Sequence, residues 1–596
     1  ISRYDHRTRQ ARHVGVYPYV QSGHGAEDMK YRFQWTSPIV ISKHDPKTVY
    51  HAANVLFKTT NGGQAWEKIS GDLTRNDKNK QKWTGGPITG DNTGVEIYGT
   101  IFTLAESPLN KKVLWAGSDD GLVHVSQDQS YTWKNVTANV PDLPDWGSVW
   151  CIEPSPHDEA TAYLVVDAHR LDDYRPYVWK TTDFGDTWNK ITEELPSDEY
   201  IRVVREDPKK KGHLYAGSER QVWHSPDSGK NWHPLKLNMP TVAITDLVVK
   251  DDDLVVGTQG RSIWILDDLT PIRQWNKQIG GKAAHAFPAL AATRWGQHGP
   301  VSDHQAVANG KNPPAGASIT YFLKEKAKKP INIEVFNEKN ERVVRLEGKE
   351  KQAVEEEDED DDAPLKFEIP GDKGMNRFAW DFKHQGAELI PKAIFDAGGA
   401  KQGPYVAPGT YTVKIIADGK TYTSKLEVRL DPRVNEPRGV AGLKQMPQKI
   451  DVAPRIATAE EATRLDKAPW ILRKNALDLV REEAKEQEQF ALRIRDDVTR
   501  ITQAVMEIRL IQKQLKQHKE LLEKDVKAKA FVKAGTAIAM KLDDLEAKLH
   551  NPKAKVLYDV LAQKGGAKLY SQFGGLFGFA SNGDGPPTQG MKDLAD

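Results

Sequence analysis

Two polar loops hold the residue types from which a catalytic or binding site could be built. Glycoside hydrolysis requires paired carboxylates, one acting as an acid and the other as a base or nucleophile. Aromatic rings and arginine beside them suit stacking on a sugar and recognition of its hydroxyl groups. Anchoring of the loops by salt bridges is the simpler alternative. The residues in question are Asp91, Glu96 and Tyr98 in the first loop and His169, Arg170, Asp172 and Asp173 in the second.

Three of these residues are the candidates for catalysis, namely Asp91, Glu96 and Asp172, because carboxylates from different loops can face each other across a cleft. Arg261 and Trp264 form a further candidate site for ligand binding. Two interpretations remain open for this pair: it lines a central channel and contacts a ligand, or it only closes the last sheet. Ligand binding is the role we assign to the remaining loop residues, Tyr98, His169, Arg170 and Asp173.

Other common chemistries have no support in the sequence. There is no Walker loop, no dinucleotide-binding glycine motif after a strand, no His-Glu-x-x-His and no Gly-x-Ser-x-Gly. Cys151 is the only cysteine, so neither an internal disulfide nor a cysteine-cluster metal site can form. No metal or cofactor is therefore predicted, with one open question. The acidic run from Glu355 to Asp362 is either a solvated loop or a weak Ca²⁺ site.

Charge and hydropathy limit the partners and the architecture. The 84 basic and 83 acidic residues leave a formal net charge of +1, too small for a general attraction to nucleic acid. No run of about 18 apolar residues is present, so no membrane span is predicted. At 596 residues the chain should form about three domains. Because the first residues read as a strand and turn without a signal-peptide pattern, we expect the natural polypeptide to extend upstream.

A short motif occurs four times in the first half of the chain, at residues 59–66, 126–133, 181–188 and 225–232. Each copy approximates Ser/Thr-x-Asp-x-Gly-x-Thr-Trp, at intervals close to the length of a propeller blade with inserted loops. The Asp is expected to accept backbone N–H bonds in a hairpin turn, Gly to take a positive φ and Trp to pack beneath. The motif residues therefore receive a structural role: Asn61, Trp66, Asp128, Trp133, Asp183, Trp188, Asp227 and Trp232.

These four motifs resemble the Asp-box (BNR) repeats of β-propellers in sortilin-type receptors, xyloglucanase-like hydrolases and sialidases. Residues 31–38, 85–89, 172–177 and 260–268 more closely resemble large secreted bacterial proteins described as sortilin N-terminal domain or glycosyl hydrolase BNR repeat proteins. The resemblance implies that residues 1–272 are the C-terminal blades of a propeller, with upstream blades in the same or a cleaved chain. It also implies a secreted or periplasmic location.

The second half changes in character. Residues 273–312 are expected to be a connector, and residues 313–432 an immunoglobulin-like β-sandwich, because apolar residues alternate in its strands. Residues 433–596 are expected to form a helical hairpin, with coiled-coil-like apolar spacing of three and four, and a tail. The apolar seam is filled either by the hairpin itself or by a protein partner. The predicted fold is thus mainly β, with propeller blades, a sandwich and a C-terminal helical hairpin.

Two functions follow from these features. The first is a secreted propeller protein that binds an extracellular glycan or polypeptide on its loops or in its channel. The alternative is a glycoside hydrolase that cleaves a polysaccharide with paired Asp and Glu residues of the propeller loops. A fold by itself does not choose between them, because function depends on the site.

Overall fold

The computed structural model describes residues 1–17, 25–86, 97–235, 237–295, 314–349, 366–389, 402–431 and 470–550, together with residues 23, 88, 90 and 92. The chain forms two compact units, Ile1–Arg273 and Gln274–Asp596, each considered by itself. We call the first the propeller unit. The acidic run from Glu355 to Asp362 and the tail after residue 550 lie outside the described residues.

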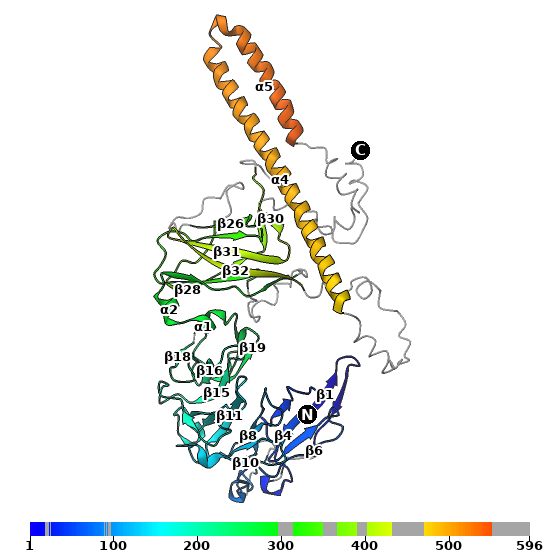
Figure 1. The fold of residues 1–596 in the computed structure, drawn as a ribbon, viewed down its shortest axis with the longest axis vertical. Coiled ribbons are helices and arrows are strands. Elements are labelled where there is room, and N and C mark those ends of the chain that lie inside the picture. The colour runs from blue at the N-terminus through cyan, green and yellow to red at the C-terminus, as the bar shows by residue number, and fades with distance from the viewer. Residues whose placement is uncertain are drawn as a thin grey trace, which may run out of the picture. The chain divides into compact units, whose positions relative to one another are not determined.

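The propeller unit contains a series of small antiparallel sheets that follow one another in an arc (Figure 1). Each sheet is a meander in which consecutive strands pair, as in a propeller blade. The strands are β3 (Ile39–Ile41), β4 (Val49–Ala52), β5 (Leu56–Thr59) and β6 (Glu67–Lys68); β7 (Ile101–Glu106), β8 (Leu114–Ser118), β9 (Val123–Ser126) and β10 (Lys134–Asn135); β11 (Ser148–Pro154), β12 (Ala162–Asp167), β13 (Val178–Thr181) and β14 (Asn189–Lys190); β15 (Ile201–Glu206), β16 (Leu214–Ser218), β17 (Val222–Ser225) and β18 (His233–Pro234); and β19 (Ile244–Lys250), β20 (Asp253–Thr258) and β21 (Ile263–Leu266).

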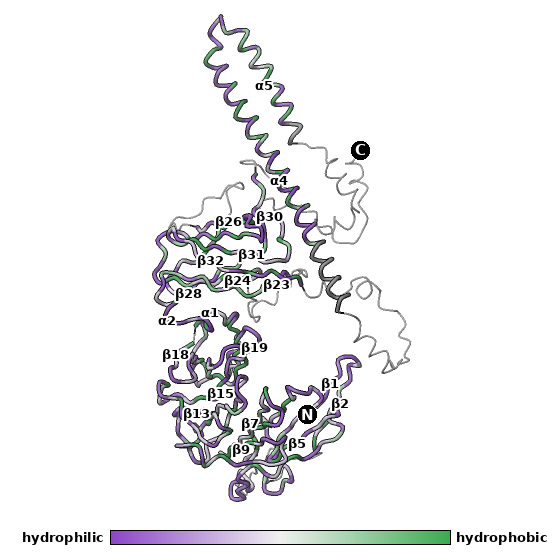
Figure 2. The backbone as a smooth tube through the Cα atoms, viewed as in Figure 1, coloured by the Kyte–Doolittle hydropathy of each residue, from purple (hydrophilic) through white to green (hydrophobic). Residues whose placement is uncertain are grey.

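Neighbouring sheets pack through their first strands, because β3 contacts β7, β7 contacts β11, β11 contacts β15 and β15 contacts β19. Between the sheets lie large side chains of the second strands. Trp115, Tyr163 and Tyr215 are 0%, 1% and 0% exposed, and they belong to apolar clusters that join one sheet to the next. The strands are mostly apolar and the connecting loops mostly polar (Figure 2). This arrangement confirms the predicted mainly β, propeller-type fold.

The repeated motif forms the predicted turn. In the third copy, the carboxylate of Asp183 accepts hydrogen bonds from the backbone N–H of Thr187 at 2.9 Å and from its hydroxyl at 2.6 Å. In the second copy Ser130 stands where the others have Gly, and it takes the same positive φ, 73°. The four Trp side chains are buried or half-buried. Equivalent bonds are made by Asn61, Asp128 and Asp227.

An N-terminal hairpin precedes the first full sheet. It consists of β1 (Ser2–Asp5) and β2 (Gln10–His13). Val14, which follows β2, accepts a hydrogen bond from the indole of Trp66 at 3.0 Å, as Ile191 after β14 does from Trp232 at 2.8 Å. Gly63 and Gly229 leave the space for these contacts, since a Cβ on either glycine would lie 2.6 Å from the apolar side chain. The strand β2 therefore lies where the outer strand of a preceding sheet would lie.

The antiparallel order of the strands separates two ends of the propeller unit. In each complete sheet, the start of the first strand and the finish of the second strand lie on the same side of the unit. In the second sheet, for example, Ile101 at the start of β7 pairs with Ser118, the last residue of β8. The loops of this end, which we call the loop rim, include residues 97–100, 119–122, 146–148, 167–173, 198–200 and 259–262. The repeated motifs follow the third strands and therefore lie at the opposite end, the box rim. The motif Asp residues are thus kept apart from the loop residues that the sequence marks as site candidates.

Replacing Asp183 with Ala is expected to lower the free energy of unfolding by about 1–2 kcal/mol, because several turn donors lose their acceptor. Asp186→Ala in the same turn removes only an exposed ion pair with Lys134 and should cost about 0.5 kcal/mol or less. Urea unfolding followed by tryptophan fluorescence measures both. Equal losses in the two variants would contradict the role assigned to Asp183.

The second unit contains a β-sandwich whose two sheets share one apolar core. Ile333, Val335, Val413 and Ile415 are each at most 1% exposed, so the predicted alternation is confirmed. The segment expected to be a connector contributes two strands and the short helix α2 (Lys277–Gly281), because strands of three residues are too short to show an alternating pattern. One sheet has the order β22 (Ala284–Ala286), β24 (Ala317–Leu323), β28 (Gly374–Trp380), and the other β23 (Ala292–Arg294), β32 (Lys420–Leu430), β31 (Gly409–Ala417), β25 (Asn332–Phe336), β26 (Arg342–Gly348), β27 (Lys366–Phe367).

Two long helices, α4 (Trp470–Leu522) and α5 (Lys529–His550), form the predicted antiparallel hairpin (Figure 1). The helix α4 also contacts the strand β30 (Gln402–Tyr405), which pairs with β29 (Lys383–Gln385). There, His384 Nε2 lies 2.6 Å from Glu488 Oε1, and both side chains are largely buried. This contact and the hydrogen bond from Thr502 to the Glu388 carbonyl connect α4 to the region of β29.

Candidate binding site at the loop rim

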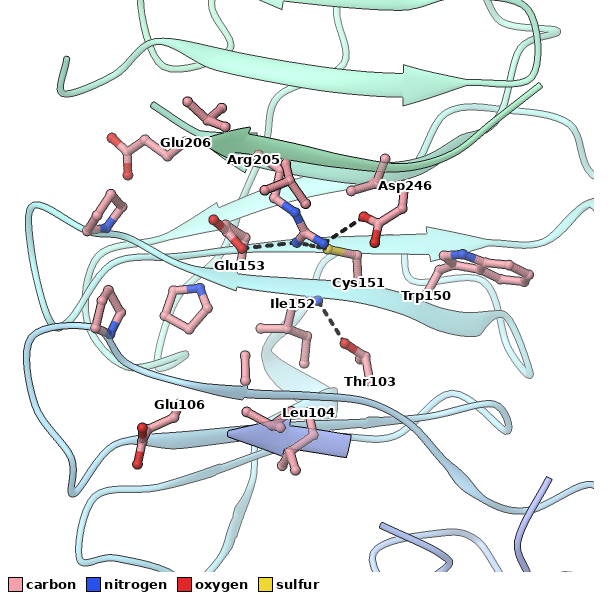
Figure 3. A pocket seen from close by; sticks show the side chains of 18 of the residues that line it. Thr103, Leu104, Glu106, Trp150, Cys151, Ile152, Glu153, Arg205, Glu206 and Asp246 are labelled. Carbon is pink, nitrogen blue, oxygen red and sulfur yellow. Dashed lines mark hydrogen bonds and ion pairs between the residues drawn. The ribbon is translucent and has the colours of Figure 1, made fainter. Parts of the chain in front are cut away.

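A cavity of about 650 Å³ runs along the first strands of the sheets, from β3 to β19. Figure 3 shows its wall, where Arg205 of β15 extends between Glu153 of β11 and Asp246 of β19. The guanidinium lies 3.0 Å from Glu153 and 2.8 Å from Asp246, and it donates a further bond to the Leu247 carbonyl. One arginine therefore connects three neighbouring sheets of the cavity wall.

The ionisable groups beside Arg205 all contact its guanidinium. Burial raises the pKa of Glu153, and the positive charge of Arg205 opposes that rise. Burial also raises the pKa of the Cys151 thiol, whose sulfur lies 3.2 Å from Arg205. A protonated, buried thiol is a poor nucleophile. Glu153 and Asp246 bind the same guanidinium, so neither is an unpaired carboxylate.

Arg202, at the start of β15, lies in the cavity wall at the loop rim. Its guanidinium stacks over the rings of Trp150 and Tyr200, 5.0 and 5.1 Å from the ring centres. Its polar contacts are long, at 3.2 Å to Gln259, 3.2 Å to the Tyr200 hydroxyl and 3.5 Å to Asp167. The Nε of Arg202 and the Oδ2 of Asp167 are buried without a hydrogen bond. Arg202 is thus held mainly by aromatic rings and lies beside the buried carboxylate of Asp167.

His169 is positioned by the same cluster. Its Nδ1 lies 2.6 Å from Asp167 Oδ1, and its ring stacks on Tyr200 with the ring centres 4.8 Å apart. Asp167 is 1% exposed and His169 24% exposed, so the carboxylate orients the ring and the imidazole edge reaches solvent. The predicted residue His169 therefore joins Asp167, Tyr200 and Arg202 in one polar and aromatic cluster.

The remaining residues of the second loop have separate environments. Asp173 binds Arg175 at 2.7 and 2.9 Å and the Tyr177 hydroxyl at 2.7 Å, and these bonds hold its pKa well below the usual range. Asp173 thus anchors the loop. Asp172 ends the short helix His169–Leu171 in a left-handed conformation, φ 60°, and its side chain is exposed, as is that of Arg170.

The first loop is described only in part. Asp91 and Glu96 lie outside the described residues. Tyr98 is half-buried and stacks on Trp146, with the ring centres 6.3 Å apart, and burial raises its pKa. Arg75 and Lys80 lie over the Trp146 ring at 4.3 and 4.5 Å. Tyr98 is therefore part of a second aromatic and cationic cluster at the loop rim.

Arg261 and Trp264 do not line the cavity. Arg261 is exposed, and its carbonyl accepts a hydrogen bond from the Trp264 indole at 2.8 Å. The half-buried Trp264 packs against the apolar cluster between the last two sheets. A role of this pair in ligand binding therefore stays a prediction.

The residues missed by sequence reasoning include Trp146, Trp150, Tyr200, Arg202 and Arg205, together with Asp167, Arg75 and Lys80. A signal for the two arginines exists in β15, whose sequence Ile-Arg-Val-Val-Arg-Glu has charges inside an otherwise apolar strand. The aromatic residues precede or begin a first strand, a position that becomes meaningful only when the sheets are arranged around the cavity.

Among the described residues, no group of three or more His, Cys, Asp or Glu side chains could hold a metal ion. None of the described helices combines the length and apolar character needed to cross a bilayer.

No protein-family model matches the chain, and no curated protein sequence matches it significantly. Solved structures are similar over part of it. A GH74 xyloglucanase from Xanthomonas campestris is 16% identical with a TM-score of 0.30, covering 48% of this chain and 42% of that one. An ancestral GH74 enzyme is 13% identical with a TM-score of 0.31, covering 67% and 46%. YCF48 bound to a D1 peptide is 14% identical with a TM-score of 0.26, covering 40% and 64%. Similarities at this level assign neither an activity nor a ligand to the chain.

Proposed function

We propose that the propeller unit is an extracellular or periplasmic module that binds a glycan at the loop rim. The observation that carries this proposal is the gathering of aromatic rings and hydrogen-bonding groups at the loop rim, where Trp150 and Arg202 also line the cavity. Trp150, Tyr200, Arg202 and His169 form one cluster, and Tyr98 and Trp146 belong to another. Aromatic faces stack on sugar rings, while arginine and histidine bind hydroxyl groups.

Exposed aromatic residues extend this surface. Trp83 and Tyr174 are 51% and 44% exposed. Trp83 closely follows Lys80, which lies over Trp146, and the ring centre of Tyr174 lies 6.1 Å from that of Tyr200. Large aromatic side chains left in solvent at the end that carries the polar clusters are available for stacking on a ligand. A chain of sugar units could contact several of these rings together, whereas one aromatic ring alone binds a sugar weakly.

Replacing Trp83 and Tyr174 with Ala together is expected to weaken glycan binding about tenfold or more, because each ring supplies about 1 kcal/mol of stacking. Binding is measured by isothermal titration against plant, algal and bacterial polysaccharides. The matched control is Tyr131→Ala, because Tyr131 is 85% exposed in the motif at residues 126–133 of the box rim. Equal effects of both changes, or preference for an unstructured polypeptide over every glycan, would contradict the proposal.

Glycoside hydrolysis is the second candidate. One observation favours it: Glu153, with a pKa raised by burial, lies in the cavity wall with the more exposed Asp246 nearby, bound to the same arginine. Glycoside hydrolases use two carboxyl groups, one as the acid and the other as the base or nucleophile. Release of reducing ends that is lost in Glu153→Gln, or in an Asp91→Ala, Asp172→Ala double variant, would establish a hydrolase.

A further inference from the structure

The first copy of the repeated turn differs from the other three at the side chain that holds the turn together. Asn61 stands where the other three copies have Asp. Its Oδ1 accepts a hydrogen bond from the Thr59 hydroxyl at 2.9 Å and one from the Ala65 backbone N–H at 3.0 Å. Asn61 therefore takes the place of the carboxylate without carrying its charge.

The side-chain amide of Asn61 also lacks a contact that the other copies make. In those copies the residue four positions further on has a polar side chain, which binds the second carboxylate oxygen. These bonds join Thr132 to Asp128, Thr187 to Asp183 and Asn231 to Asp227. In the first copy that residue is Ala65, which has no polar side-chain atom, and both Asn61 and Ala65 are exposed to water.

Gly62, which follows Asn61, has a positive φ of 69°. The corresponding residues of the other copies, Gln129, Phe184 and Ser228, share this left-handed conformation but carry a side chain. Because glycine has no Cβ, its backbone nitrogen approaches the side chain of the preceding residue with less hindrance. An Asn-Gly sequence is for this reason the one in which a backbone nitrogen most readily attacks a side-chain amide.

Arg3 of the N-terminal hairpin lies against the same turn. A Cβ on Gly62 would lie 2.4 Å from Arg3 Nη1, so the guanidinium is close to the backbone of Gly62. Arg3 forms no ion pair with another described residue, so its charge is not neutralised there. A positive charge stabilises the negative charge that the Gly62 nitrogen carries when it loses its proton. The fold therefore places a cation beside the atom that would act as the nucleophile.

We propose that Asn61 is a self-modification site, at which the amide is converted to a carboxylate without an enzyme. The deprotonated nitrogen of Gly62 attacks Cγ of Asn61, a bond forms between these two atoms, and the side-chain nitrogen leaves as ammonia after taking up protons. Water then opens the cyclic imide at the new bond, which restores the backbone N–H and leaves a carboxylate. In sum, one water is consumed and one ammonium ion is released.

The turn is suited to hold this product. The hydroxyl of Thr59 and the backbone N–H of Ala65 are the same kinds of donor that bind Asp183 in the third copy. Hydrogen bonds to a charged acceptor are stronger than those to a neutral one. Opening of the imide at its other C–N bond gives isoaspartate, whose additional backbone methylene does not fit the turn. We therefore expect aspartate to be the product that the folded chain retains.

Peptide mapping by mass spectrometry tests the proposal on the full chain, incubated at mildly alkaline pH. The chain has three Asn-Gly sequences, at Asn61, Asn309 and Asn582, and mapping follows each one separately. Asn61 is expected to lose its amide with time. Arg3→Gln should slow this loss about fourfold, the effect of a unit charge at about 5 Å in water. The same variant should leave the rates at Asn309 and Asn582 unchanged.

Two controls separate the fold from the sequence. In urea, where the turn is lost, the unmodified chain and Arg3→Gln should deamidate at Asn61 equally fast. Asn61→Asp supplies the product directly, and its urea midpoint should equal that of the converted chain. An Asn61 that keeps its amide in the folded chain while Asn309 and Asn582 lose theirs would overturn the proposal. Equal rates at Asn61 in the folded unmodified and Arg3→Gln chains would overturn the role of Arg3, and a converted chain less stable than Asn61→Asp would contradict the assigned product.

Discussion

Replacement of Arg273 by Met should lower the free energy of unfolding of the propeller unit by about 3–5 kcal/mol. Arg273 lies in the helix α1 (Thr270–Gln274) and is 9% exposed. Its Nε donates to Asp207 at 2.8 Å, and its Nη1 lies 2.5 Å from Asp252. Asp207 is 0% exposed, so the variant would leave a buried carboxylate without its main partner. Methionine fills much of the same volume, which makes the lost charge the dominant change.

A matched control uses the same acceptor. Lys209 binds the carboxylate of Asp252 at 2.7 Å, but its side chain is 51% exposed. Lys209→Met should therefore cost less than about 1 kcal/mol, as is usual for surface ion pairs. Urea unfolding of the full chain, followed by tryptophan fluorescence, compares the two. A loss below about 1 kcal/mol for Arg273→Met would show that Asp207 does not depend on this arginine.

The repeated part of the fold could be predicted because each repeat carries its own local signal. Asp183 and its counterparts specify a turn within a few residues, so their hydrogen bonds follow from the motif alone. Tyr163 and Tyr215 follow an Asp-Pro or Ser-Pro turn by a constant interval, and both are buried between sheets. Four copies of one motif predict the fold more strongly than a single copy would.

The candidate site was harder to predict, because its contacts join residues from different sheets. Arg205 meets Glu153 and Asp246, which are far from it in sequence, and no local pattern pairs them. His169 was predicted from its loop, but the partners that orient it, Asp167 and Tyr200, lie at a strand end and in the next loop. The short strands β22 and β23 were missed for a related reason, because partner strands far along the chain define them.

Acidification from pH 7 to pH 4 should destabilise the propeller unit through buried histidines. Burial lowers the pKa of His124 to about 4, and burial and then His213, 3.3 Å away, lower that of His224 to about 4. An unfolded chain binds these protons near pH 6.5, so between pH 6.5 and 4 it takes up more protons than the folded chain. Stability therefore falls as the pH falls through this window, by up to about 3 kcal/mol for each histidine.

Asp119 changes the stability with pH in the opposite direction, so it tests the sign of the effect. Burial raises the pKa of Asp119 to about 7, so its contribution to stability is present at low pH and is lost as the pH rises from about 4 to 7. His124→Gln and His224→Gln should each flatten the fall in stability toward pH 4, whereas Asp119→Asn should steepen it. Urea unfolding at pH 7, 5.5 and 4 measures these slopes. If the histidine variants keep the slope of the unmodified chain, the imidazoles already bind protons in the folded state, and their burial does not exclude the charge.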